Sequence, residues 1–229
     1  MNILAFDTAT NACTAALQVG DQIFSRHKIA PREHASLLLP QIQALCDEAS
    51  FDIAELNAIA FGCGPGSFMG VRLATGIAQG LAFGLNIPLI PISTLQIIAQ
   101  TAFEKSAEKF ILAGWDARIE EIYWGFYEID HTDIAQPIIN DQLGAPSGVD
   151  IVSFGHIGFT LAGNAWDVYQ DQLPAPLSQA KQKFTDLYPE ARAMLTIAKA
   201  KYLANEHVSP DAAHPHYIRH HVVHNHSQK

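Results

Sequence analysis

The sequence predicts an α/β fold with mixed sheets of the ribonuclease-H-like type, flanked by helices and arranged in two lobes. Three apolar runs joined by short turns come first, and helices then alternate with strands. A strand that ends in Asp, followed by a turn and a second strand, occurs at residues 3–9 and again at 111–117. We interpret this similarity as an internal repeat and predict lobes at 1–106 and 107–229.

The first lobe is predicted to begin with three strands that follow one another as a meander. Gly20-Asp21 is typical of a hairpin turn between the second and the third. Apolar residues then recur at helical spacing after Glu33 and after Ser67. Pro40 should kink the first helix, because proline cannot donate a backbone hydrogen bond to the preceding turn. The predicted strands are 2–6, 13–19, 22–29, 57–62 and 88–92, and the predicted helices are 33–49, 67–85 and one from a Ser93 or Thr94 cap to about 106.

The second lobe shows clear elements only at its two ends. An apolar strand at 109–115 and an aromatic-rich strand at 120–129 open it, and apolar residues from Leu187 to Tyr202 mark a final amphipathic helix. Between them the sequence is polar and rich in proline and glycine, which predicts short elements at most over 130–152. We predict a short strand at 159–163, a short helix at 165–171 and a loop at 173–183.

Composition and charge narrow the function. The chain has 229 residues, of which 48% are hydrophobic and 16% charged, as in ordinary globular proteins. A net charge of −9 argues against this chain binding a nucleic-acid backbone by itself. The three cysteines lie far apart without metal-site spacing, so we expect reduced thiols in a cytoplasmic protein. Asp7 interrupts the first apolar run, and no long apolar stretch lacks polar groups, so neither a signal peptide nor a membrane span is expected.

The chain is organised around a glycine-rich turn at 62–72. Gly64 and Gly66 permit positive φ and Pro65 fixes its own φ, which predicts a tight, stiff turn after a buried strand. Ser67 is a suitable cap for the helix that follows. The free N–H groups of that helix start could hold a phosphate, or the turn could simply connect a strand to a helix.

The helix after this turn carries two rows of small residues on nearly opposite faces. Each interior glycine costs about 1 kcal/mol relative to alanine, so close approach of another backbone is the expected compensation. We expect the helix to lie between its own sheet and a second body, which is either another helix of this chain or a partner subunit. The rows are Gly70, Ala74, Ala78 and Ala82 on one face, and Gly76, Gly80 and Gly84 on the other.

Two aspartates are candidates for phosphotransfer chemistry. Asp7 and Asp116 each follow a strand at a predicted hairpin, and facing carboxylates of this kind hold hydrated Mg²⁺ beneath ATP in actin-like kinases. Each could equally well end its strand and cap a turn. His34 could act as a base, or it could be a surface or interface residue. No metal site is assigned, and the histidines of the tail more simply form a loose polar segment: His207, His214, His216, His220, His221, His224 and His226.

Several motifs together resemble the bacterial TsaB (YeaZ) family in register over almost the whole chain. The most characteristic is Gly-Pro-Gly-Ser-Phe within residues 62–72, with Met69 standing where the family usually has Thr. The other motifs are residues 3–10, 30–35, 79–83, 116–118, 121–124 and 217–219. The resemblance implies two actin-like lobes, with the final helix returning to the first.

The resemblance also implies a role in the synthesis of threonylcarbamoyladenosine beside the anticodon of tRNA. There a TsaD-type subunit carries out the transfer, TsaB is its non-catalytic dimerisation partner, and TsaE is an ATPase that joins them. The segment 92–98 contains no metal ligand where the catalytic relative has a histidine pair. We therefore expect a scaffold subunit that also forms homodimers, meets tRNA only through the complex, and does not contact membranes.

We expect the partner surface to combine the helices at 33–49 and 67–85. The same helical surface of each subunit would pack against the other. No tightly bound cofactor is expected, and ATP or ADP is the candidate ligand of the cleft. The alternative function is an active enzyme, either an ATP-dependent phosphotransferase or a glycopeptidase-like protein. The predicted interface residues are His34, Leu38, Ile42, Leu45, Gly70, Val71, Ala74 and Ala78, and the candidate nucleotide or phosphate residues are Asp7, Gly64, Gly66, Ser67 and Asp116.

Overall fold

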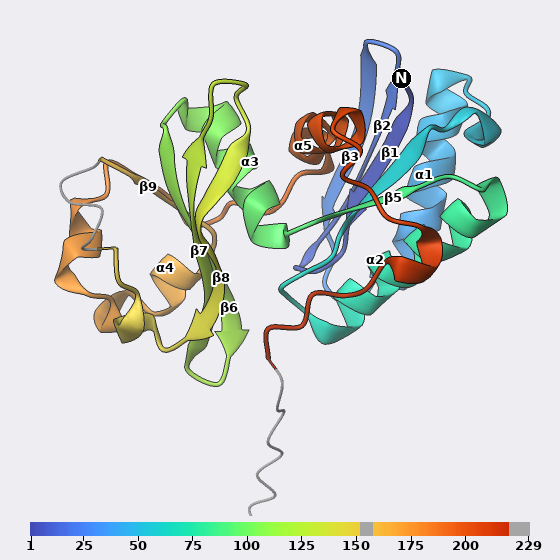
Figure 1. Cartoon of the computed structure of the whole chain (residues 1–229). Helices are drawn as coiled ribbons and strands as arrows, with labels where there is room; N and C mark the ends of the chain where they lie inside the picture. The colour runs from blue at the N-terminus through green and yellow to red at the C-terminus, as the bar shows by residue number, and fades with distance from the viewer. Residues whose placement is uncertain (152–157, 220–229) are drawn as a thin grey trace, which may run out of the picture.

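The computed structural model describes residues 1–151 and 158–219, which form two lobes side by side (Figure 1). The first lobe contains a five-stranded mixed sheet in the order β3-β2-β1-β4-β5. β2 pairs antiparallel with β1 and β3, whereas β1, β4 and β5 are parallel to one another. The strands are β1 (Ile3–Asp7), β2 (Ala12–Val19), β3 (Gln22–Ile29), β4 (Ala58–Gly62) and β5 (Leu89–Ile92).

The second lobe repeats this sheet strand for strand. Its order is β10-β9-β6-β7-β8, with β7 antiparallel to both neighbours and β6, β9 and β10 mutually parallel. β6 therefore occupies the central place that β1 has in the first sheet, which confirms the two-lobed α/β class. The strands are β6 (Phe110–Arg118), β7 (Glu121–Ile129), β8 (Ala135–Gly144), β9 (Thr160–Ala162) and β10 (Gln182–Phe184).

Alternation along the strands divides the core of the first lobe into two layers. Leu4 and Phe6 of β1 face α1 (His34–Ala49) and α2 (Phe68–Leu85). Ile3 and Ala5 face the opposite way, toward α5 (Ala191–Leu203). Side chains on a strand point alternately to its two faces, so the sheet needs a helical layer on each side. The final helix thus covers the first lobe although it follows the second in sequence.

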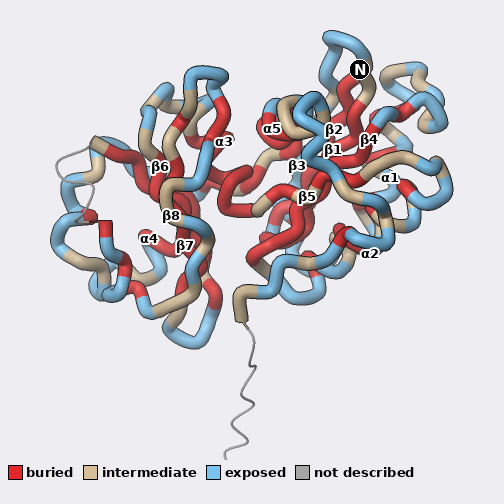
Figure 2. The backbone as a smooth tube through the Cα atoms, in the orientation of Figure 1, coloured by how far each residue is buried: buried red, intermediate tan, exposed pale blue. Residues whose placement is uncertain are grey.

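Helix α3 (Thr94–Ser106) lies between the lobes and is buried on most of its surface (Figure 2). Leu95, Ile98 and Ala102 pack on the second sheet, whereas Ile97 faces the layer formed with α5. By packing, α3 therefore belongs to both lobes rather than to the first alone. The remaining short elements are α4 (Ala165–Val168) and the 3-10 turns Ile53–Glu55, Pro146–Gly148, Gln170–Gln172, Ala175–Gln179 and Pro210–Ala212.

Two strands depart from the sequence-based expectations. The region 130–152 contains the ten-residue strand β8 rather than short elements only, and the expected loop at 173–183 runs into the edge strand β10. β8 lies at the sheet edge, and only Ala135 of its ten residues is fully buried, so it lacks the apolar pattern of a buried strand. The final helix begins at Ala191, which leaves Leu187 in the preceding loop.

Among the described helices, α2 has the length and apolar composition that could span a membrane. Its inner row, Gly70, Ala74, Ala78 and Ala82, is instead buried against the first sheet. The helix is therefore one layer of the α/β fold.

Candidate functional site

The glycine-rich turn docks the start of α2 onto the turn between β1 and β2. The Ser67 N–H donates to the Ala9 carbonyl at 2.7 Å, and the Thr8 hydroxyl donates to the Gly70 carbonyl at 2.7 Å. A Cβ on Gly66 would lie 2.3 Å from the Ala9 oxygen, and one on Gly70 would lie 1.9 Å from the Thr8 oxygen. Both glycines are thus required by close backbone approach. The Ser67 hydroxyl accepts from the Gly70 N–H at 3.4 Å, as expected of the helix cap.

Gly66→Ala should destabilise the first lobe by at least about 2 kcal/mol, because the added methyl group meets a backbone atom that cannot rotate away. Urea unfolding followed by circular dichroism measures the change. Gly148→Ala is the matched control, since a Cβ there meets nothing within 4 Å. Equal stabilities of the two variants would contradict the assigned role of Gly66.

Asp7 is sealed in the core and does not line the cleft. Its side chain has no exposed surface, and its two carboxylate oxygens accept from the Ala9 N–H at 2.7 Å and the Thr94 hydroxyl at 2.9 Å. A Cβ on Gly62 would lie 1.7 Å from the carboxylate, so that glycine provides its space. Burial raises the pKa of Asp7 to about 6, against the lowering effect of both hydrogen bonds. These contacts fit the interpretation that Asp7 ends its strand and caps a turn, and not the one in which it faces the cleft.

Asp116 lies at the cleft, but its oxygens are already engaged. One oxygen accepts from the Arg118 N–H at 2.8 Å and from the Tyr169 hydroxyl at 2.9 Å. The other forms an ion pair with the Arg118 guanidinium at 3.0 Å. The carboxylates of Asp7 and Asp116 thus do not face each other across the cleft.

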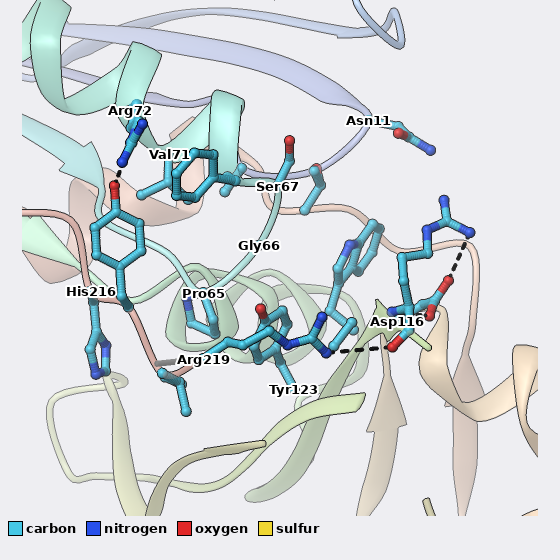
Figure 3. A pocket seen from close by; sticks show the side chains of 18 of the residues that line it. Asn11, Pro65, Gly66, Ser67, Val71, Arg72, Asp116, Tyr123, His216 and Arg219 are labelled. Atoms are coloured by element: carbon cyan, nitrogen blue, oxygen red, sulfur yellow. Dashed lines mark hydrogen bonds and ion pairs between the residues drawn. The ribbon is translucent and has the colours of Figure 1, made fainter. Parts of the chain in front are cut away.

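A cavity of about 640 Å³ opens between the lobes (Figure 3). Residues from six places surround it: the β1–β2 turn, the glycine-rich turn with the start of α2, the end of β6, Tyr123 of β7, Asn164 before α4, and the segment 216–219. Of the predicted phosphate residues, Gly66, Ser67 and Asp116 line this cavity, whereas Asp7 and Gly64 do not. Gly64 is buried, with φ +101°, and its carbonyl accepts from the Thr94 N–H at 2.8 Å.

The segment after the last helix is the part of the site that sequence reasoning missed. It runs back across the first lobe, where the His216 N–H donates to the Cys63 carbonyl at 2.7 Å. Arg72 donates to the Tyr217 hydroxyl at 2.7 Å, and Arg219 contacts Glu121 of the second lobe at 2.5 Å. The segment therefore joins both lobes at the cavity. Its family-like motif at 217–219 was the available signal.

A buried polar cluster beside the cleft was also missed. Asp141 of β8 accepts hydrogen bonds from the Ser93 hydroxyl, at 2.5 Å, and from the Tyr127 hydroxyl. Burial raises the pKa of Asp141 despite these hydrogen bonds, and burial beside Asp141 raises that of Tyr127 well above its usual value. Since β8 itself was not predicted, the sequence analysis did not place Asp141 here. Through the hydrogen bond between Asp141 and Ser93, the cluster connects the second lobe to the N-terminal end of α3.

The predicted interface residues need correction, because most of them face the chain's own sheet. His34 is half-buried, and its Nε2 is enclosed without a hydrogen-bond partner among the described residues, whereas the other seven are buried. Buried side chains of this layer cannot touch a partner without unfolding the lobe, so a charged substitution such as Leu38→Asp or Ala74→Arg would disrupt the fold rather than test an interface. The seven are Leu38, Ile42, Leu45, Gly70, Val71, Ala74 and Ala78.

The opposite face of α2 is exposed instead. Gly76 and Gly80 have nothing of this chain within 4 Å of an added Cβ, so no helix of the described part covers them. Met69 and Phe83 are 71% and 82% exposed. We call this face the outer stripe of α2 and define it as Met69, Leu73, Gly76, Gly80 and Phe83.

Metal binding is not supported within the described ranges. No group of three or more His, Cys, Asp or Glu side chains there could hold an ion. His207, His214 and His216 of the predicted polar tail lie in the described part, whereas His220, His221, His224 and His226 lie outside it. The three cysteines are free and buried, and burial raises the pKa of each thiol.

Two lobes with the same five-stranded mixed sheet, facing each other across a cleft, define an α/β protein of the actin-like class. The family model described as "TsaD: tRNA N6-adenosine threonylcarbamoyltransferase" matches residues 22–225. The tRNA threonylcarbamoyladenosine biosynthesis protein TsaB of Escherichia coli (strain K12) is 34% identical, over 97% of this chain and 96% of that protein. Its namesake from Haemophilus influenzae is 33% identical, over 97% and 95%.

A solved structure described as YeaZ from Pseudomonas aeruginosa superposes with a TM-score of 0.90. It is 34% identical and covers 94% of this chain and 99% of its own. The chain therefore belongs to the TsaB (YeaZ) family, within the broader TsaD-like group that the family model describes.

Proposed function

We propose that this chain is a non-catalytic scaffold subunit of the complex that forms threonylcarbamoyladenosine in tRNA. Its partner would be a TsaD-type subunit that carries out the transfer, with a TsaE-type ATPase joining them in the cytoplasm. Family membership supports the assignment to this pathway, since the names of the full-length relatives refer to tRNA threonylcarbamoyladenosine biosynthesis. The buried, unpaired thiols suit a reducing compartment.

The outer stripe of α2 is the observation that carries the scaffold role. Its residues follow one another at intervals of four, three, four and three, which is the heptad spacing of helices that pack along each other. Exposed glycines in a helix interior destabilise it, and close approach of a partner helix would offset that cost. A TsaD-type subunit fits because the family model relates its fold to this chain, so two similar helical layers can meet face to face. The same geometry allows a homodimer.

Reconstitution tests this function. Threonylcarbamoyl transfer to tRNA should be measured with the TsaD-type and TsaE-type subunits of the same organism, with and without this chain. We expect strong dependence on the chain and no nucleotide or peptide turnover by the chain alone. Transfer at full rate without it, or turnover by the purified chain, would contradict the scaffold role.

A further inference from the structure

The segment that follows α5 is attached to the first lobe over most of its length. We call residues 206–219 the strap, and Figure 1 shows it passing from α5 across the first lobe and ending between the lobes. Val208 exchanges two backbone hydrogen bonds with Leu89 of the edge strand β5, at 2.8 and 2.9 Å. Gln79 of α2 donates to two strap carbonyls at 3.1 and 2.9 Å, and Ala213 is buried in the core of that lobe.

The end of the strap crosses from the first lobe to the second at two adjacent residues. Tyr217 still faces the first lobe, where its hydroxyl accepts a hydrogen bond from Arg72 of α2. Ile218 instead packs against the core of the second lobe, and Arg219 forms an ion pair with Glu121 of β7 at 2.5 Å. The Arg219 guanidinium also donates to the last carbonyl of β6 at 3.5 Å. Neighbouring strap residues thus contact different lobes.

The contacts of the strap with the second lobe are small and partly exposed. Ile218 is half-buried, and the side chains of Arg219 and Glu121 are 18% and 39% exposed. His216 adds a long contact, with its Nδ1 4.0 Å from the carboxylate of Asp141. Ion pairs at solvent-exposed positions contribute about 0–1 kcal/mol. This end of the strap can therefore detach while the buried contacts with the first lobe stay in place.

The firmer connection between the lobes lies on the other side. α3 packs on both lobes, and the chain that enters α5 donates from Glu190 N–H to the Thr101 hydroxyl at 3.3 Å and from Ala191 N–H to the Thr14 hydroxyl at 2.9 Å. In the view of Figure 1, α5 lies at the top of the region between the lobes and the end of the strap lies at the bottom. Two lobes joined by buried helices on one side and by a small exposed contact on the other can open at the exposed contact.

We propose that Ile218 and Arg219 form a releasable clasp that holds the two lobes together. When the clasp is attached, it fixes β6 and β7 of the second lobe against the strap. When it is released, the second lobe swings away about α3, and the rest of the strap stays on the first lobe. The device consists of this chain alone, so it needs neither a ligand in the cavity nor the scaffold role. A molecule that binds one arrangement of the lobes better than the other would shift the equilibrium between them.

Single-molecule fluorescence energy transfer in the full, isolated chain tests the clasp. Dyes on Ala35→Cys in the first lobe and Ser147→Cys in the second report the distance between the lobes, and both positions are exposed and lie outside the cavity lining. The three natural thiols are buried with raised pKa values, so they should react slowly with the dyes. We expect a single population of transfer efficiency when the clasp residues are natural.

Reversing one charge of the ion pair should open the lobes. Arg219→Glu places two carboxylates side by side, so we expect a second population with lower transfer efficiency. Combining Arg219→Glu with Glu121→Arg restores opposite charges and should return the single population. Arg26→Glu is the control, since it breaks an ion pair within the first lobe and should leave the efficiency unchanged. An unchanged efficiency in Arg219→Glu, or a change that the double variant does not reverse, would overturn the proposal.

Discussion

Replacing Gly76 and Gly80 together by alanine should make the isolated chain more stable while weakening its association with the partner. Both glycines lie inside α2 with open space around an added Cβ. Alanine lowers the free-energy cost of the helix by about 1 kcal/mol at each position. The double variant should therefore gain about 2 kcal/mol, which raises Tm by about 4–8 °C in a chain of this size. Thermal unfolding followed by circular dichroism measures the gain.

The same two methyl groups should keep a partner helix from approaching the outer stripe closely. Association with the TsaD-type subunit should weaken although the monomer is more stable, and few interface variants combine those two effects. Gly70→Ala is the control within the same helix, because its Cβ would lie 1.9 Å from the Thr8 oxygen and should destabilise the monomer. A double variant that is less stable than the natural chain would show that the stripe is not free in the monomer.

Asp7→Asn should stabilise the protein at neutral and alkaline pH. The folded pKa of about 6 exceeds the unfolded value of 3.8, so the folded state holds this proton more tightly. The stabilisation that the bound proton gives the folded state is complete below about pH 3.8 and is lost as the pH rises through 6. At 1.36 kcal/mol per unit, the ionised carboxylate costs about 3 kcal/mol at pH 8, and the near-isosteric amide avoids that cost.

Urea unfolding of Asp7→Asn and the natural protein at two pH values tests this expectation. The difference in the free energy of unfolding should be about 3 kcal/mol at pH 8 and narrow to about 1 kcal/mol at pH 4.5. The variant should also support threonylcarbamoyl transfer in the reconstituted system. A loss of that activity with the fold intact would favour the enzymatic alternative, in which Asp7 is catalytic.

The sequence predicted the first lobe well because its signals are local. Short continuous apolar runs, the hairpin at Gly20 and the Ser67 cap each act within a few residues, and all lie where expected. β8 was missed because a polar edge strand carries little periodicity. The repeat could have supplied it, since β8 occupies the place in the second sheet that β3 has in the first.

The site was less predictable because it depends on contacts distant in sequence. Arg72 and Tyr217 are 145 residues apart, and no local pattern shows that they meet. Spacing likewise revealed two small-residue rows on α2 but not which of them faces the sheet. Alanine methyl groups fill the core at Ala74 and Ala78, whereas the glycines at 76 and 80 would leave gaps there, so residue size was the overlooked signal.

Sedimentation velocity of the chain mixed with the TsaD-type subunit tests the central claim most directly. Gly80→Arg places a long charged side chain on the outer stripe, and Gly148→Arg places one at an open position of the second lobe. We predict a heterodimer for the natural chain and for Gly148→Arg, and separate monomers for Gly80→Arg with its thermal stability intact. A heterodimer that forms equally well with Gly80→Arg would contradict the assignment of this surface.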